Sequence, residues 1–155
     1  MKANSTLKDI YGVSGAVVVG VDGSNSSIEA LEWAVEQTHL TGRPLIAITT
    51  WEWPASYGAD GWLGDVDFEG DARKTLHDSI AKSLGDEGAL GVTQKVIHGH
   101  PAQVFVDASK DASLLVVGSR GHGEFAGMLL GSVSEFLATH AKCPVVIVRH
   151  DDAHD

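Results

Sequence analysis

The stretch that decides the fold is Ala16-Val17-Val18-Val19-Gly20-Val21, which leads directly into Asp22-Gly23-Ser24. Valine is β-branched and favours strands, and an unbroken apolar run indicates a strand that is covered on both faces. After Ser24 or Asn25, either of which suits a helix N-cap, apolar residues recur near the helical period until Gly42 supplies a stop. The segment therefore predicts a buried strand, a tight turn and an amphipathic helix.

The same alternation continues through the rest of the chain. Short apolar runs lie at residues 45–50, 92–97, 114–118 and 144–149, and the second of these is the most polar, which favours a place nearer the sheet edge. Helical patterns fill residues 72–84 and begin again at Pro101 and at Ser132. Strands that alternate with helices, joined by right-handed crossovers, favour a three-layer α/β fold with a doubly wound parallel sheet. The expected strand order is 3-2-1-4-5.

The length of the chain, 155 residues, fits one domain. We expect a single domain over residues 1–155, with its core at about 14–149 and loose ends at 1–12 and 150–155. The long connection at residues 51–70 contains Trp51, Trp53 and Trp62, and connections of this length are usually functional or flexible. Packing of these rings on the core and stacking on a ligand base both remain open.

Charge and composition exclude several classes of function. Asp and Glu number 21 against 11 Lys and Arg, so the net charge is −10 and no broad basic face is available for nucleic acid. The single cysteine, Cys143, excludes an internal disulfide, and we expect an inert, buried thiol in preference to a redox switch. No apolar run approaches the ~20 residues of a membrane span. The first fifteen residues lack the apolar part of a signal peptide, so we expect a cytoplasmic protein.

The most informative stretch for function is Val117-Gly118-Ser119-Arg120-Gly121-His122-Gly123, which runs on to Gly131-Ser132-Val133-Ser134. It leaves the carboxyl end of a buried strand and enters a helix N-terminus, the place where open α/β sheets bind ligands. Glycines let backbone N–H groups approach a ligand, and the helix start adds unpaired N–H donors with a favourable dipole. We therefore expect a phosphate site, with hydroxyl donors at Ser132 and Ser134. Across the crevice, Asp22 is placed to bind ribose hydroxyls or Mg²⁺.

Other interpretations of the same residues stay open. Asp22 also suits a helix cap, Ser132 has capping-box spacing to Glu135, and Arg120 serves equally as a phosphate partner or a solvated surface charge. A dinucleotide fingerprint at residues 121–126 follows the fourth strand and not the first, which argues against NAD or FAD, and no P-loop motif is present. His98 and His100 resemble half a metal site, but exposed loop histidines are the simpler interpretation.

Four segments together resemble the universal stress protein family. They are the spacing Gly118-x2-Gly121-x9-Gly131-Ser132, the early Val19-Gly20-Val21-Asp22-Gly23-Ser24, the step Gly99-x-Pro101-Ala102 and the late Cys143-Pro144-Val145-Val146-Ile147-Val148. The resemblance covers about residues 14–149 and implies a flavodoxin-like, Rossmann-like domain. It also implies a homodimer paired through the last strand, at Val145, Val146, Ile147 and Val148.

The glycine signature is that of the ATP-binding branch of the family. The resemblance places Asp22 at the ribose and the phosphate-bound Mg²⁺, and Thr50 at the adenine. It places the ribose and phosphates in a cradle formed by Gly118, Gly121, Gly131, Ser132, Val133 and Ser134, to which we add Arg120 from its position in the loop.

The function predicted from the sequence is a nucleotide-dependent stress-response regulator that binds ATP between the first and fourth strands. No general base is evident, so we expect no dedicated enzyme and at most a weak ATPase. A slow ATPase, a cyclic AMP-binding module and a dimeric interaction scaffold with an empty pocket are the alternatives. The protein partner that responds to the bound state is not indicated by the sequence.

Overall fold

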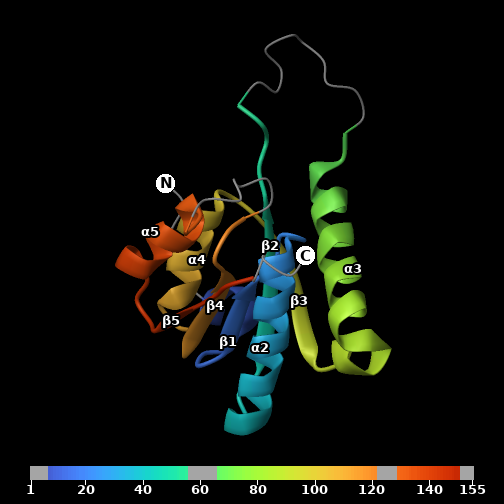
Figure 1. Cartoon of the computed structure of the whole chain (residues 1–155), viewed down its shortest axis with the longest axis vertical. Helices are drawn as coiled ribbons and strands as arrows, with labels where there is room; N and C mark the ends of the chain where they lie inside the picture. Colours follow the sequence, from blue (N-terminus) through green and yellow to red (C-terminus); the bar gives the residue numbers. More distant parts are fainter. Residues whose placement is uncertain (1–6, 56–65, 122–128, 151–155) are drawn as a thin grey trace.

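The computed structural model describes residues 7–55, 66–121 and 129–150. Five parallel strands form one sheet in the order β3-β2-β1-β4-β5, as predicted. Each strand lies within about one residue of its expected position, and the fold is therefore the expected three-layer α/β sandwich (Figure 1). The strands are β1 (Val17–Gly20), β2 (Leu45–Trp51), β3 (Val92–His98), β4 (Leu114–Gly118) and β5 (Val145–Val148).

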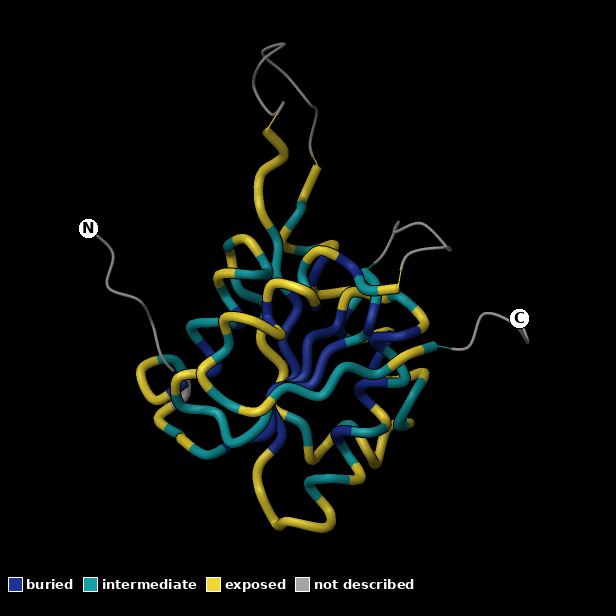
Figure 2. Tube along the Cα trace, turned by 60° about the vertical axis from the view of Figure 1, so that its left-hand side comes forward, coloured by how far each residue is buried: buried dark blue, intermediate teal, exposed yellow. Residues whose placement is uncertain are grey.

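Helices cover both faces of the sheet (Figure 1). On one face lie α2 (Asn25–Thr41) and α3 (Phe68–Ala89), and on the other lie α1 (Leu7–Tyr11), α4 (Pro101–Ser109) and α5 (Ser132–His140). Alternate residues of β1 point into the two apolar layers, so Val17 and Val19 pack towards α2 while Val18 packs towards α4 and α5. The residues buried in this way gather along the central strands (Figure 2).

The ends of α2 follow the sequence pattern. The Ser24 side chain accepts a hydrogen bond from the N–H of Ser27, and Gly42 ends the helix in the left-handed region, at φ 72°. By contrast, α3 begins at Phe68, before the expected Ala72, because Asp67 caps it through the N–H of Gly70. The helix bends at Gly85, where φ is 70°. In the described residues no helix is both long and apolar enough to cross a bilayer.

The amino-terminal end of the chain differs from the sequence expectation. The sequence predicts that residues 1–12 lack regular structure, yet residues 7–11 form α1. The Leu7 side chain is completely buried in the apolar layer between the sheet and α4, which also contains Val18, Ala108 and Leu115. A single leucine therefore fastens this short helix to the core.

The carboxyl end of β4 makes an unusually close contact with α2. A Cβ atom added at Gly118 would lie 2.8 Å from both the carbonyl carbon of Ser26 and the nitrogen of Ser27, and closer still to Oγ of Ser26. No side chain fits in this space, since heavy-atom contacts of that length are strongly repulsive. The absence of a side chain at Gly118 thus serves the packing of α2 on β4, in addition to any role towards a ligand.

Removing the Leu7 side chain tests whether α1 belongs to the folded unit. We expect Leu7→Ala to lower the free energy of unfolding by at least about 2 kcal/mol, because it leaves a cavity in the core. The matched control is Leu90→Ala, since Leu90 is 88% exposed and its truncation is expected to change stability by under about 0.5 kcal/mol. Urea unfolding of both variants checks this, and equal stabilities would show that the amino-terminal end is loose.

Adding one methyl group at Gly118 tests the close contact with α2. We expect Gly118→Ala to destabilise the fold by about 1–3 kcal/mol, because α2 must move away from β4. At Gly91 the same substitution meets open space, with the carbonyl oxygen of Gly88 as its nearest neighbour at 4.0 Å, so Gly91→Ala is expected to be neutral. A Gly118→Ala variant as stable as Gly91→Ala in denaturant unfolding contradicts the contact.

Candidate functional site

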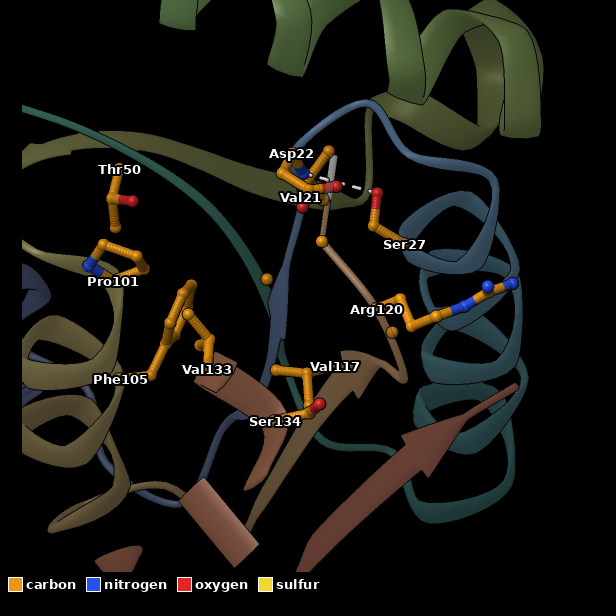
Figure 3. A pocket seen from close by; sticks show the side chains of 13 residues that line it. Val21, Asp22, Ser27, Thr50, Pro101, Phe105, Val117, Arg120, Val133 and Ser134 are labelled. Atoms are coloured by element: carbon orange, nitrogen blue, oxygen red, sulfur yellow. Dashed lines mark hydrogen bonds between the residues drawn. The ribbon is translucent and has the colours of Figure 1, made fainter. Parts of the chain in front are cut away.

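A cavity opens at the carboxyl edge of the sheet, between β1 and β4, where the strand order reverses (Figure 3). Its volume is about 120 Å³. Ligands of open α/β sheets bind at this reversal point. The residues that line it are Gly20, Val21, Asp22, Ser27, Thr50, Pro101, Phe105, Val117, Gly118, Arg120, Gly121, Val133 and Ser134.

The cavity has one apolar side and one polar side. Figure 3 shows Pro101, Phe105 and Val133 together with Thr50 on one side, and Asp22 with Ser27 on the other. Phe105 is buried, and its ring fills the space left by the missing side chain of Gly20. Such a surface suits a ligand with a flat apolar end and a polar end, because each end meets its own kind of environment.

Asp22 shapes the turn between β1 and α2. Its Oδ1 accepts the N–H of Ser24 at 2.9 Å, while the helix itself is capped by Ser24, whose Oγ accepts the N–H of Ser27 at 3.2 Å. The N–H of Asp22 donates to Oγ of Ser27 at 3.3 Å (Figure 3). The helix cap that the sequence left open between these residues is therefore Ser24, and Asp22 lies at the cavity with an exposed carboxylate.

The loop after β4 is held from two sides. The carbonyl of Ser119 accepts the N–H of Gly131 at 2.6 Å and the hydroxyl of Ser134 at 2.7 Å, both from the start of α5. The carbonyl of Arg120 accepts the hydroxyl of Ser26 at 2.8 Å, from the start of α2. Two helix N-termini thus converge on neighbouring peptide groups beside the cavity.

The start of α5 differs from the capping box that the sequence indicated. Gly131 and not Ser132 occupies the N-cap position, and it makes no side-chain cap hydrogen bond. In contrast, α2, α3 and α4 are each capped by a side chain. The first-turn N–H groups of a helix have no acceptor within the helix. At α5 these groups belong to Ser132, Val133 and Ser134.

Seven of the predicted site residues line the cavity and two, Gly131 and Ser132, do not; the seven are Asp22, Thr50, Gly118, Arg120, Gly121, Val133 and Ser134. The hydroxyl of Ser134 donates to backbone carbonyls and so does not project as the free donor that the sequence suggested. Ser132 lies on an adjoining groove between α4 and α5, alongside His100 and Phe136. The Arg120 side chain extends away from Pro101 and Val133, although Arg120 is among the lining residues (Figure 3).

Sequence reasoning missed several residues of the cavity. In the sequence these residues have the pattern of strand, cap or core residues. The cavity lining includes Val21, Ser27, Pro101, Phe105 and Val117. Pro101 was predicted as the start of a helix and not as a ligand contact, and Phe105 was not singled out. A signal was available in the sequence, because the helix that follows the third strand begins at the same edge of the sheet as the site. Pro101 and Phe105 are the first and fifth residues of that helix.

The remaining polar and aromatic signals have structural roles. His98 packs on Trp51 with ring centroids 4.5 Å apart, and Nδ1 of His100 accepts the N–H of Ala102 and so caps α4. Within the described ranges no three His, Cys, Asp or Glu side chains are grouped to hold a metal ion. Trp53 contacts Trp51 and Phe68 but is 47% exposed, so these rings pack on one another at the surface and not in the core, while Trp62 lies outside the described residues.

Cys143 is half-buried and close to the carbonyl of Pro144. Burial raises the pKa of its thiol, and a backbone hydrogen bond at Leu115 lowers that pKa by a smaller amount. A raised pKa keeps the thiol protonated, and the protonated thiol is a poor nucleophile. This agrees with the inert role predicted for Cys143.

The amino-acid sequence of this chain is similar to those of known proteins. The profile of the universal stress protein family matches residues 15–149. Universal stress protein Rv2623 of Mycobacterium tuberculosis is 36% identical over 139 residues, which is 86% of this chain and 44% of that protein. The chain thus spans about half the length of the curated relatives it matches.

Solved structures agree in fold. Universal stress protein UspA from Lactobacillus plantarum superposes with a TM-score of 0.67 at 18% identity, covering 88% of this chain and 98% of that one. A universal stress protein solved in complex with cAMP has a TM-score of 0.61 at 28% identity, covering 87% and 97% of the two chains. On its sequence match over residues 15–149, this chain belongs to the universal stress protein family.

Proposed function

We propose that this chain binds ATP with Mg²⁺ in the cavity between β1 and β4, and that the bound state acts as a stress-response signal. The observation that carries the proposal is the start of α5, which lacks a side-chain cap and borders an apolar cavity at the reversal point of the sheet. Backbone N–H groups and the helix dipole favour an anion there, and the apolar wall favours a flat ring. A nucleotide satisfies both requirements.

The two sides of the cavity give the nucleotide a direction. The base lies against Pro101, Phe105 and Val133 near Thr50, and the ribose lies towards Asp22. The phosphates extend through the open mouth of the cavity. Their cradle consists of the residues of the ATP-branch signature and the helix start, namely Gly118, Gly121, Gly131, Ser132, Val133 and Ser134. Arg120 contributes its positive charge to the loop from a distance.

A magnesium ion fits this arrangement without a protein cage. Mg²⁺ bound with nucleotides usually keeps several waters and takes one or two carboxylates together with phosphate oxygens. Asp22 supplies an exposed carboxylate at the cavity. The ion, when bound, would neutralise part of the phosphate charge next to an acidic protein.

The lining supports binding more than rapid catalysis. Among the lining residues that the structure describes, which exclude residues 122–128, Asp22 is the one carboxylate, no histidine or lysine occurs, and the cation is Arg120, whose side chain extends away from Pro101 and Val133. Proton transfer from an attacking water needs a positioned base, and phosphoryl transfer gains greatly from a cation at the transferred group. We therefore expect slow hydrolysis at most, with the loaded state itself as the signal, in the cytoplasm where nucleotides are available.

Cyclic AMP is the second candidate, because a relative of 28% identity was solved in complex with it. That nucleotide carries one phosphate, so it would use the enclosed part of the cavity and little of the open mouth. The phosphate cradle at α5 would then contact fewer oxygens than with ATP. Direct competition between the two nucleotides decides which is bound more tightly.

Isothermal titration tests the proposal, with ATP·Mg²⁺ and cyclic AMP titrated separately and in competition. We expect ATP·Mg²⁺ to bind, and Gly131→Val to weaken it at least about tenfold because a branched side chain crowds the first-turn N–H groups. Gly91→Val is the matched control, since position 91 has open space. No binding of either nucleotide at about millimolar concentration, roughly −4 kcal/mol, ends the proposal.

We further propose a homodimer paired through β5. Residues Val145–Val148 form an apolar edge strand of which every residue is half-exposed, whereas the opposite edge, β3, carries polar residues that include Lys95. Lysine on an edge strand discourages pairing, so the β5 edge is the one suited to a second copy. Sedimentation equilibrium at micromolar concentration is expected to give the mass of two chains, and the mass of one chain contradicts this.

A further inference from the structure

We infer that Ser26, a residue outside the cavity, positions the backbone N–H of Gly121 as a donor to a ligand phosphate. This inference rests on the proposed nucleotide site, and it assigns a role to a residue that neither the glycine signature nor the cavity lining includes. Ser26 is a positioning residue, because it acts through the peptide group between Arg120 and Gly121.

The contact is short and partly buried. Ser26 is 4% exposed, and its hydroxyl donates to the carbonyl oxygen of Arg120 at 2.8 Å, across 94 residues of sequence. The hydroxyl of Ser24 donates a second, longer hydrogen bond to the same oxygen at 3.4 Å, while it accepts the N–H of Ser27 as the cap of α2. The tight packing of Gly118 on the first turn of α2 is what brings Ser26 within reach of the loop.

Because the Arg120 carbonyl and the Gly121 N–H belong to one peptide group, the contact with Ser26 also sets the direction of the Gly121 N–H. In a trans peptide the C=O of one residue and the N–H of the next point in opposite directions, and the described chain has no cis peptide bond. Because the Arg120 carbonyl points at α2, the Gly121 N–H points away from α2. In Figure 3, Pro101, Phe105 and Val133 lie on the side of the cavity opposite Ser27 of α2. Since Gly121 is itself a lining residue, we infer that its N–H is directed into the cavity.

The neighbouring peptide group is held in the opposite sense. The Ser119 carbonyl points at α5, where it accepts from Gly131 and Ser134. Consecutive carbonyls are thus fixed towards different helices, which determines both peptide planes. Without the Ser26 hydroxyl the Arg120 carbonyl keeps only the longer hydrogen bond from Ser24, at 3.4 Å, and a glycine at position 121 permits the rotated orientation since it has no Cβ. A rotated plane presents a carbonyl, and not an N–H, to a phosphate.

The inference predicts a loss that depends on the phosphates of the ligand. For Ser26→Ala we expect ATP·Mg²⁺ to bind about tenfold more weakly, because one charge-assisted hydrogen bond is lost. Adenosine, which has no phosphate, is expected to bind the variant and the original protein equally. Ser26→Cys fills the same space with a weak donor and is expected to behave like Ser26→Ala. Isothermal titration measures both ligands.

Ser113→Ala is the matched control. Its hydroxyl also joins distant segments, donating to the carbonyl of Ala16 at 3.1 Å, but at the opposite end of the sheet. We expect this variant to bind ATP·Mg²⁺ within about twofold of the original protein. If Ser26→Ala weakens the binding of ATP·Mg²⁺ and of adenosine equally, Ser26 has a purely structural role and the inference is wrong. Unchanged ATP affinity in both Ser26 variants also overturns the inference. If the original protein binds neither ligand, the proposed function has failed first.

Discussion

The close approach of α2 to the carboxyl end of β4 is the constraint on which the site depends. Because Gly118 has no side chain, the first turn of α2 lies against the strand and reaches the loop that follows it. The turn at Asp22 and the Arg120 peptide are thereby held on the same side of the cavity. From the other side, α5 holds the carbonyl of Ser119. The phosphate cradle is thus a product of helix packing as much as of the glycine loop itself.

An anion site in a chain of net charge −10 requires local donors that outweigh the overall field. Backbone N–H groups at a helix start contact a bound anion directly. The acidic surface charges that lie more than about 8–10 Å away are largely screened by salt, so they oppose binding only weakly. The apolar wall formed by Pro101, Phe105 and Val133 excludes water from one end of the cavity and strengthens nearby hydrogen bonds. A cation that travels with the nucleotide fits this acidic surface better than a fixed cluster of lysines.

Much of the fold was predictable because its signals are local. Four of the five strands were found from apolar runs, and α2 from a cap expected at Ser24 or Asn25 and its stop at Gly42. Two features escaped for physical reasons. The helix α1 is too short to show periodicity and depends on one buried leucine, Leu7. The site residues that act through distant contacts, such as Ser26 on the Arg120 carbonyl, give no local pattern at all.

Amide chemical shifts measured by NMR during titration with ATP·Mg²⁺ test the central claim most directly, because they report each backbone N–H separately. The account predicts that the largest changes fall on Gly121, Ser132, Val133 and Ser134, and that adenosine alone moves the amides near Thr50 and Phe105 instead. Changes centred elsewhere, for example on the groove of Arg73, Lys74 and His77 between α3 and β3, would contradict it.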